Sequence, residues 1–200
     1  MRVIAGLGNP GDEYRESRHN AGFLVVAGLA RAHAIRLAAG SGGFVSGTGR
    51  VAGQVVLLVL PQELMNASGP PVARALGSVG AVPADLLVVC DDIALPLGRL
   101  RLRASGSDGG HRGLRSIVGA LGTEEFARLR LGVGAPPEGN DAADYVLDRF
   151  LPKERPAVTD MVSRAVEAIE LLLARGIGEA MNVYNRKERS EGATEPGEAS

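Results

Sequence analysis

Four polar side chains are candidates for chemistry because each lies beside the end of a predicted element. Asn9 and Asn66 each follow a predicted strand, and Asp91 directly follows a continuously apolar run. His19 lies at the start of the first long predicted helix. Since open α/β sheets place their sites at the carboxyl ends of their strands, we expect these side chains to converge.

A histidine paired with a carboxylate predicts general-base catalysis. Asp91 would fix the tautomer and the orientation of His19, so that the imidazole removes a proton from water. No serine lies in a G-x-S-x-G elbow, and Cys90 lies inside an apolar strand. Activated water is therefore the simplest nucleophile. From spacing alone, a capping or core role for His19 is an equal alternative.

The sequence predicts neither a metal site nor a cofactor. His33 and His111 do not share a metal-ligand spacing with His19. The chain has 1 cysteine, which excludes an internal disulfide and a cysteine-based metal framework.

The glycines at positions 6, 8 and 11 match the G-x-G-x-x-G pattern of dinucleotide-binding proteins. In that fold a helix begins at the glycine turn, and an acid some 20 residues later binds the ribose. Here Pro10 and three polar residues follow the turn instead, and no Asp or Glu occurs between Ser17 and Gln62. We therefore interpret the glycines as a tight turn that presents Asn9.

Composition predicts a soluble globular protein with one domain. The chain has 200 residues, of which 45% are hydrophobic and 22% charged, and its formal net charge is −1. Its first residues show no charged segment followed by a long apolar one, so we expect no signal peptide, and its longest apolar run, 55–60, is far too short to span a membrane. Together with the low cysteine content, these features predict a cytoplasmic protein.

Strand and helix patterns alternate along the chain. Strands are predicted at 2–7, 44–50, 54–60, 86–90, 99–103 and 128–134. Helices are predicted at 21–35, with Asn20 as N-cap, and at 71–79, 113–121, 152–175 and 178–184. This alternation predicts a single-domain α/β three-layer sandwich, with a mixed central sheet and helices on both faces, over residues 1–186. Residues 187–200 are polar and predict a disordered tail.

Basic residues form a second pattern. Arg99, Arg101 and Arg103 alternate along one predicted strand, and Arg128 and Arg130 repeat the alternation on the next. Residues two apart in a strand face the same way, so two neighbouring strands would present one basic face. A solvated surface is the default interpretation, but the adjacent glycine-rich loop favours a phosphate-backbone partner.

Several motifs, all in the same order, resemble bacterial-type peptidyl-tRNA hydrolase. They are GLGNPG at 6–11 with Tyr14, RHNAGF at 18–23, LMNASG at 64–69, Asp91-Asp92 with LPLG at 95–98, GGHRGL at 109–114 and RLRLGVG at 128–134. The resemblance extends from residue 2 to about residue 185.

This resemblance implies cleavage of the ester that joins a peptide to the terminal ribose of tRNA. His19 would activate water, Asp91 would orient His19, and Asn9 would sense the first amide of the peptide. The groove for the peptide and the tRNA 3′ end would be lined by Tyr14, Leu64, Asn66 and Arg112. Arg103 and Arg130 would bind the tRNA 5′ phosphate. The family implies a monomer that needs no metal and no cofactor and has no membrane partner.

Three positions depart from the pattern of this family. Leu64 replaces a common aromatic residue, so an apolar contact is kept but stacking is lost. Ala94 replaces a frequent acid outside the catalytic pair. Arg112 replaces the commoner Asn, and because arginine only donates, we expect contact there to shift toward phosphate.

Two other classes of protein compete with a hydrolase. One is an RNA-binding protein that keeps the fold without catalysis, and the presence of Asn9, His19, Asn66 and Asp91 argues against it. The other is a nucleotide-dependent oxidoreductase, which the absence of an acid in the expected region argues against.

Overall fold

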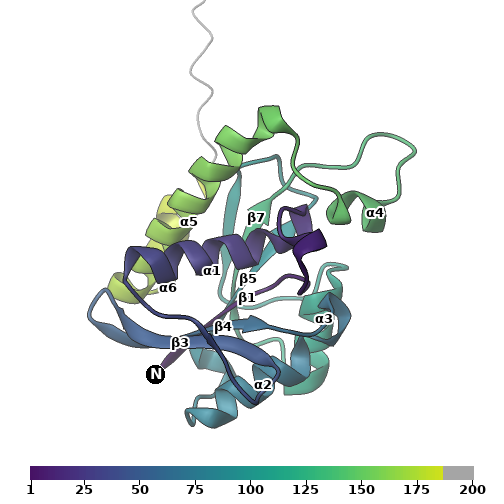
Figure 1. The fold of residues 1–200 in the computed structure, drawn as a ribbon. Helices are drawn as coiled ribbons and strands as arrows, with labels where there is room; N and C mark the ends of the chain where they lie inside the picture. The colour runs from purple at the N-terminus through teal and green to yellow at the C-terminus, as the bar shows by residue number, and fades with distance from the viewer. Residues whose placement is uncertain (187–200) are drawn as a thin grey trace, which may run out of the picture.

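A mixed seven-stranded sheet forms the centre of the protein in the computed structural model, which describes residues 1–186 (Figure 1). The strand order is β2-β3-β4-β1-β5-β7-β6. The strands are β1 (Arg2–Gly6), β2 (Ala38–Ala39), β3 (Phe44–Val51), β4 (Gln54–Pro61), β5 (Leu86–Asp92), β6 (Leu100–Arg103) and β7 (Ala127–Gly132). The neighbours β4, β1, β5 and β7 are parallel, whereas β2, β3 and β6 pair antiparallel.

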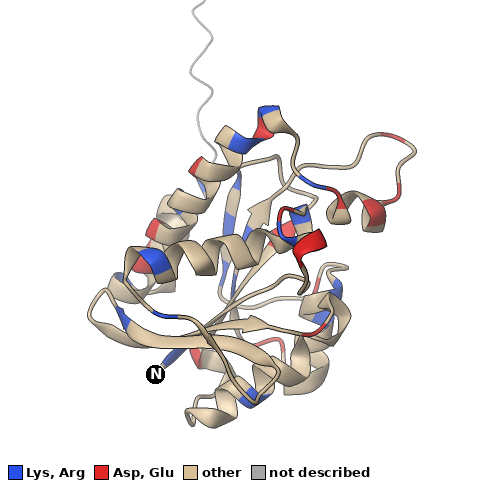
Figure 2. Ribbon diagram, viewed as in Figure 1, with Lys and Arg blue, Asp and Glu red and all other residues tan. Residues whose placement is uncertain are grey.

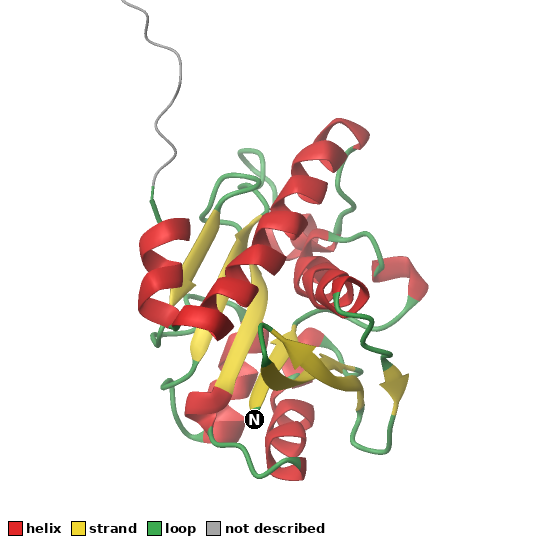
Figure 3. Ribbon diagram, turned by 90° about the vertical axis from the view of Figure 1, so that its left-hand side faces the viewer, coloured by secondary structure: helices red, strands yellow, loops and turns green. Residues whose placement is uncertain are grey.

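Helices cover both faces of this sheet, which confirms the predicted α/β three-layer sandwich (Figure 3). One face packs against α1 (Ala21–Ala32), α5 (Arg155–Arg175) and α6 (Ile177–Tyr184). The other face packs against α2 (Gly69–Ser78) and α3 (Arg112–Leu121). The predicted tail, 187–200, lies outside the described residues.

Alternate side chains of the central strands build two separate cores. In β1, Val3 and Ala5 pack toward α2 and α3, whereas Ile4 packs toward α1 and α5. Strands that are covered on both faces have no polar face, which explains the continuously apolar sequence at 86–90. Cys90 is fully buried in this core, and burial raises the pKa of its thiol, so it stays protonated and is no nucleophile.

Two helices differ from the predicted ones. Helix α1 ends at Ala32 because Ala34 adopts a left-handed conformation, with φ of 51°, and turns the chain toward β2. Helix α4 (Ala142–Leu147) was not predicted. It has 6 residues, too few to show a periodicity, and the Asp141 carboxylate caps it by accepting a hydrogen bond from the Ala143 amide at 2.6 Å.

Within residues 1–186, no helix combines the length and the apolar character that a membrane crossing requires.

A close backbone contact brings the start of α1 onto the carboxyl ends of β1 and β5. A Cβ atom at Gly22 would lie 2.6 Å from both the amide nitrogen and the carbonyl oxygen of Leu7, and it would also clash with the carbonyl of Val89. Only glycine permits this approach. Because His19 lies in the 3₁₀ turn directly before α1, the contact places the imidazole beside Asp91 at the end of β5.

Replacing Gly22 with alanine is therefore expected to destabilise the protein by about 1–3 kcal/mol, since the strand backbone cannot move aside. Gly119 in α3 is a matched control, because a Cβ atom there meets nothing within 4 Å. Gly119→Ala should stabilise the protein by about 0.5–1 kcal/mol through helix propensity. Urea unfolding of both variants measures the difference, and equal stabilities would contradict the close contact.

Candidate active site

A cavity of about 720 Å³ opens where β1, β4 and β5 end. Eight of the nine site residues predicted from the sequence line it: Asn9, Tyr14, His19, Leu64, Asn66, Asp91, Arg112 and Arg130. Arg103 does not belong to the lining. The short helix α4 forms another wall through Ala143, Val146 and Leu147.

A buried hydrogen bond joins His19 to Asp91, with 2.8 Å between Nδ1 of the ring and Oδ1 of the carboxylate. Burial would raise the pKa of Asp91, but hydrogen bonds and charge from His111 and His19 outweigh it and hold the pKa well below its usual range. The carboxylate is therefore ionised and can only accept, so Nδ1 of His19 carries the hydrogen. The lone pair of this imidazole then lies on Nε2.

The second imidazole on Asp91 belongs to His111, which the sequence analysis did not assign to the site. Its Nε2 lies 3.0 Å from the same Oδ1, and its Nδ1 accepts hydrogen bonds from the amides of Gly113 and Leu114 at 3.1 and 3.2 Å. Because Nδ1 accepts, Nε2 must carry the hydrogen and donate it to Asp91. The sequence signal that could have assigned His111 to the site is its position directly after a glycine loop and before a predicted helix.

These three residues also place one possible metal-ligand atom each within 4.8 Å of one another. The ring nitrogens that face Asp91, Nδ1 of His19 and Nε2 of His111, are the ones that carry hydrogens in the network above. A cation would have to displace both protons, and His111 could not move its proton to Nδ1 without losing the two amide hydrogen bonds. The hydrogen bonds thus account for the cluster, and the absence of a metal remains a prediction.

Asn9 is held in one orientation. Its side-chain Oδ1 accepts a hydrogen bond from the Met65 amide at 2.7 Å, so the Nδ2 donor is the group left for the cavity. The backbone of Asn9 pairs with the side chain of Asn20, at 2.8 Å through the amide and 3.0 Å through the carbonyl. Asn20 occupies the N-cap position of α1 as predicted, but its side chain holds the glycine turn and makes no capping hydrogen bond.

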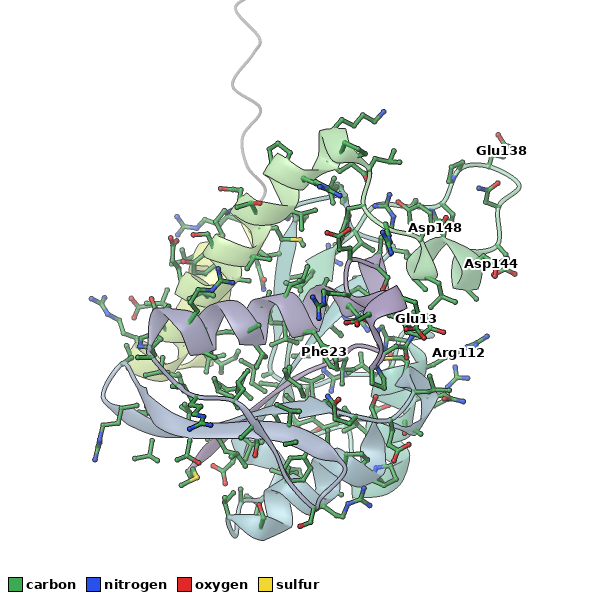
Figure 4. All side chains as sticks on the ribbon, viewed as in Figure 1. Glu13, Phe23, Arg112, Glu138, Asp144 and Asp148 are labelled. Atoms are coloured by element: carbon green, nitrogen blue, oxygen red, sulfur yellow. The ribbon has the colours of Figure 1, made fainter. Side chains whose placement is uncertain are left out.

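The rim of the cavity is open and polar. Leu64 is 56% exposed, Asn66 and Arg112 are exposed, and Tyr14 is half buried. Arg112 begins α3 on one side of the opening, and Asp144 lies on α4 on the other (Figure 4). A substrate that enters the cavity therefore passes between a basic and an acidic side chain.

The predicted basic strands are neighbours in the sheet. Antiparallel pairing sets Arg101 opposite Arg130 and Arg103 opposite Arg128, so these side chains share one face. Figure 2 marks the positions of Lys and Arg along the ribbon in blue. Arg101 and Arg103 are exposed. Arg130 is partly buried and pairs with Asp92 at 3.2 Å.

Arg128 does not contribute to an exposed basic face, contrary to the prediction. It is 1% exposed, and its guanidinium donates to the carbonyl oxygens of Gly106, Ser107, Glu124 and Phe126. The glycine-rich loop folds over this side chain, which explains why strand alternation alone could not reveal its burial. Arg99, which precedes β6, is also occupied, because it donates to the Asn185 carbonyl at 2.7 Å.

Known proteins resemble this sequence along almost its whole length. The sequence profile described as peptidyl-tRNA hydrolase matches residues 3–192. The peptidyl-tRNA hydrolase of Chloroflexus aggregans is 47% identical over 186 residues, covering 92% of this chain and 99% of the relative. That of Bacillus subtilis is 43% identical over 187 residues, covering 94% of this chain and 100% of the relative.

A crystal structure of peptidyl-tRNA hydrolase from Acinetobacter baumannii superposes with a TM-score of 0.86 at 35% identity, covering 91% of this chain and 93% of that one. The residues that the sequence profile matches include every residue around the cavity. The chain belongs to the peptidyl-tRNA hydrolase family.

Proposed function

We propose that this protein hydrolyses the ester bond between peptide and tRNA in peptidyl-tRNA, which releases free tRNA and a free peptide. The observation that carries the proposal is the buried 2.8 Å hydrogen bond from His19 to Asp91, which leaves a basic nitrogen at the cavity. The names of the relatives give the substrate.

In the first step His19 acts as a general base. Nε2 takes a proton from water while the water oxygen attacks the ester carbonyl, and the imidazolium that forms is stabilised by the Asp91 carboxylate. When the tetrahedral intermediate collapses, the bond to the ribose oxygen breaks, and the same proton passes to that oxygen. Asp91 stays ionised throughout, as its lowered pKa requires.

Asn9 is suited to distinguish a peptide from a single amino acid. Its Oδ1 is occupied by the Met65 amide, so it presents a hydrogen-bond donor to the cavity. The carbonyl of the first peptide bond is an acceptor that peptidyl-tRNA has and aminoacyl-tRNA lacks. A donor in a fixed position therefore favours the peptidyl substrate.

Recognition of the tRNA is assigned to the cavity rim and to the edge of the sheet. Tyr14, Leu64, Asn66 and Arg112 would contact the peptide and the tRNA 3′ end, where they line the opening. Arg103 and Arg130, which lie diagonally across β6 and β7, would bind the 5′ phosphate. The proposal also includes that the protein acts as a monomer in the cytoplasm and needs no metal or cofactor.

His19→Ala is expected to reduce hydrolysis of an N-acetylated aminoacyl-tRNA by on the order of 10²–10⁴, because the general base is lost. Binding of tRNA should remain. The matched control is His33→Ala, which removes a histidine that pairs with Glu170 far from the cavity. Release of tRNA is measured, with unblocked aminoacyl-tRNA as a poor substrate. Substantial activity of the His19 variant would refute the assignment.

Asp91→Asn is expected to lower the rate by on the order of 10² and to move the acid limb of the pH–rate profile to lower pH. In the native protein the lowered pKa keeps Asp91 ionised across this limb, so the limb reports protonation of His19. Asparagine carries no charge to stabilise the imidazolium, and protonation therefore needs more acid. A limb that stays in place would contradict the pairing.

Arg103→Ala is expected to weaken tRNA binding and to flatten its salt dependence, so that the negative slope of log K against log salt becomes smaller in magnitude by about 1. Adding Arg130→Ala should flatten the slope again by less, because Asp92 already pairs with that guanidinium. Arg50→Ala, on the hairpin away from the cavity, serves as control. If the double variant keeps the native slope, the phosphate site lies elsewhere.

A further inference from the structure

A buried arginine lies immediately before the proposed general base and has no part in the chemistry described above. Arg18 is 3% exposed and begins the 3₁₀ turn Arg18–Asn20 that carries His19. Burying a guanidinium is costly unless its hydrogen bonds and its charge are matched by the surroundings. The partners of Arg18 therefore show which parts of the structure the buried guanidinium holds together.

The guanidinium of Arg18 binds four groups from distant parts of the sequence. It donates to the Val133 carbonyl at 3.1 Å and to the Glu154 carboxylate at 2.8 Å. It also lies over the ring of Tyr145, 4.4 Å from the centroid, and near the ring of Phe150 at 5.0 Å. The planar guanidinium makes these hydrogen bonds and ring contacts at the same time, and the ammonium group of lysine cannot reproduce that arrangement.

These partners connect the His19 turn to a wall of the cavity. Tyr145 belongs to α4, whose Ala143, Val146 and Leu147 line the cavity, and its hydroxyl donates to the same Val133 carbonyl at 3.1 Å. A backbone hydrogen bond also joins the His19 turn to the end of α4, because the Arg18 amide donates to the Asp148 carbonyl at 3.0 Å.

We propose that Arg18 is a positioning residue, which sets the turn that carries His19 and the α4 wall of the cavity relative to each other. Through Tyr145 it holds the wall that contacts the substrate, and through its own backbone it holds the base. Displacement of a base by about 1 Å can cost on the order of 10²-fold in rate. The inference rests on the proposed hydrolysis, since it assigns His19 as the base.

The test compares kcat and KM for an N-acetylated aminoacyl-tRNA in four variants, assayed well below their unfolding temperatures. Arg18→Lys should lower kcat by about tenfold or more and also raise KM, because base and wall both move. Tyr145→Leu should raise KM by about tenfold while kcat changes little, because only α4 is released. Tyr145→Phe keeps the ring beneath the guanidinium and should resemble the native enzyme.

Leu173→Ala is the matched control for lost stability. Leu173 is buried in α5 and is not among the residues that line the cavity of the site. This variant should unfold at a lower temperature and keep both kcat and KM. If Arg18 had a purely structural role, Arg18→Lys would behave like Leu173→Ala and lose only stability. Values of kcat and KM for Arg18→Lys within about twofold of native would therefore overturn the proposal.

A second measurement separates this inference from the proposed function. The proton on Nδ1 of His19, which bonds to Asp91, gives a downfield resonance in proton NMR spectra, and Arg18→Lys should shift or broaden it whereas Leu173→Ala should not. If the native protein fails to hydrolyse the substrate, the proposed function fails, and the resonance still tests the positioning role. If Arg18→Lys does not fold, identical KM values for Tyr145→Leu and Tyr145→Phe would overturn the link to α4.

Discussion

The site depends on one carboxylate oxygen that accepts two imidazole N–H groups. Oδ1 of Asp91 lies 2.8 Å from Nδ1 of His19 and 3.0 Å from Nε2 of His111. The lowered pKa of Asp91 keeps this buried carboxylate ionised, so both rings must donate to it, and the tautomers of both histidines follow. The amides at the start of α3 complete the network by donating to the far nitrogen of His111. His19 is thus left with its lone pair at the cavity.

The fold satisfies this constraint through contacts that polar side chains alone could not provide. Asp91 reaches the cavity because β5 is parallel to β1 and ends beside it. His19 reaches Asp91 because Gly22 lets α1 start against the strand backbone. The fixed Asn9 turn depends on Asn20, which follows His19 directly. His19, Asp91 and Asn9 are therefore placed at the cavity by one junction of strand ends and helix start.

The sequence predicted the sheet, its two-sided burial and the convergence of Asn9, His19, Asn66 and Asp91 at the cavity, because these follow from local patterns and from where parallel strands end. It did not predict what depends on contacts between distant segments. His111 was considered only for its spacing as a metal ligand, and spacing does not reveal a shared carboxylate. Arg128 follows the strand alternation of Arg130, but the loop that covers it lies some 20 residues away.

The charges around His19 also explain why a cation so close to the base is tolerated. Burial opposes ionisation of Glu154, but the hydrogen bond from Arg18 prevails and lowers its pKa, so the carboxylate neutralises the guanidinium. Glu154 thus balances the charge of Arg18, and the charge of Asp91 is left to act on His19. In the proposed hydrolysis the proton taken from water makes that ring positive, so the field of Asp91 would favour the transition state over the resting state, which is what catalysis requires.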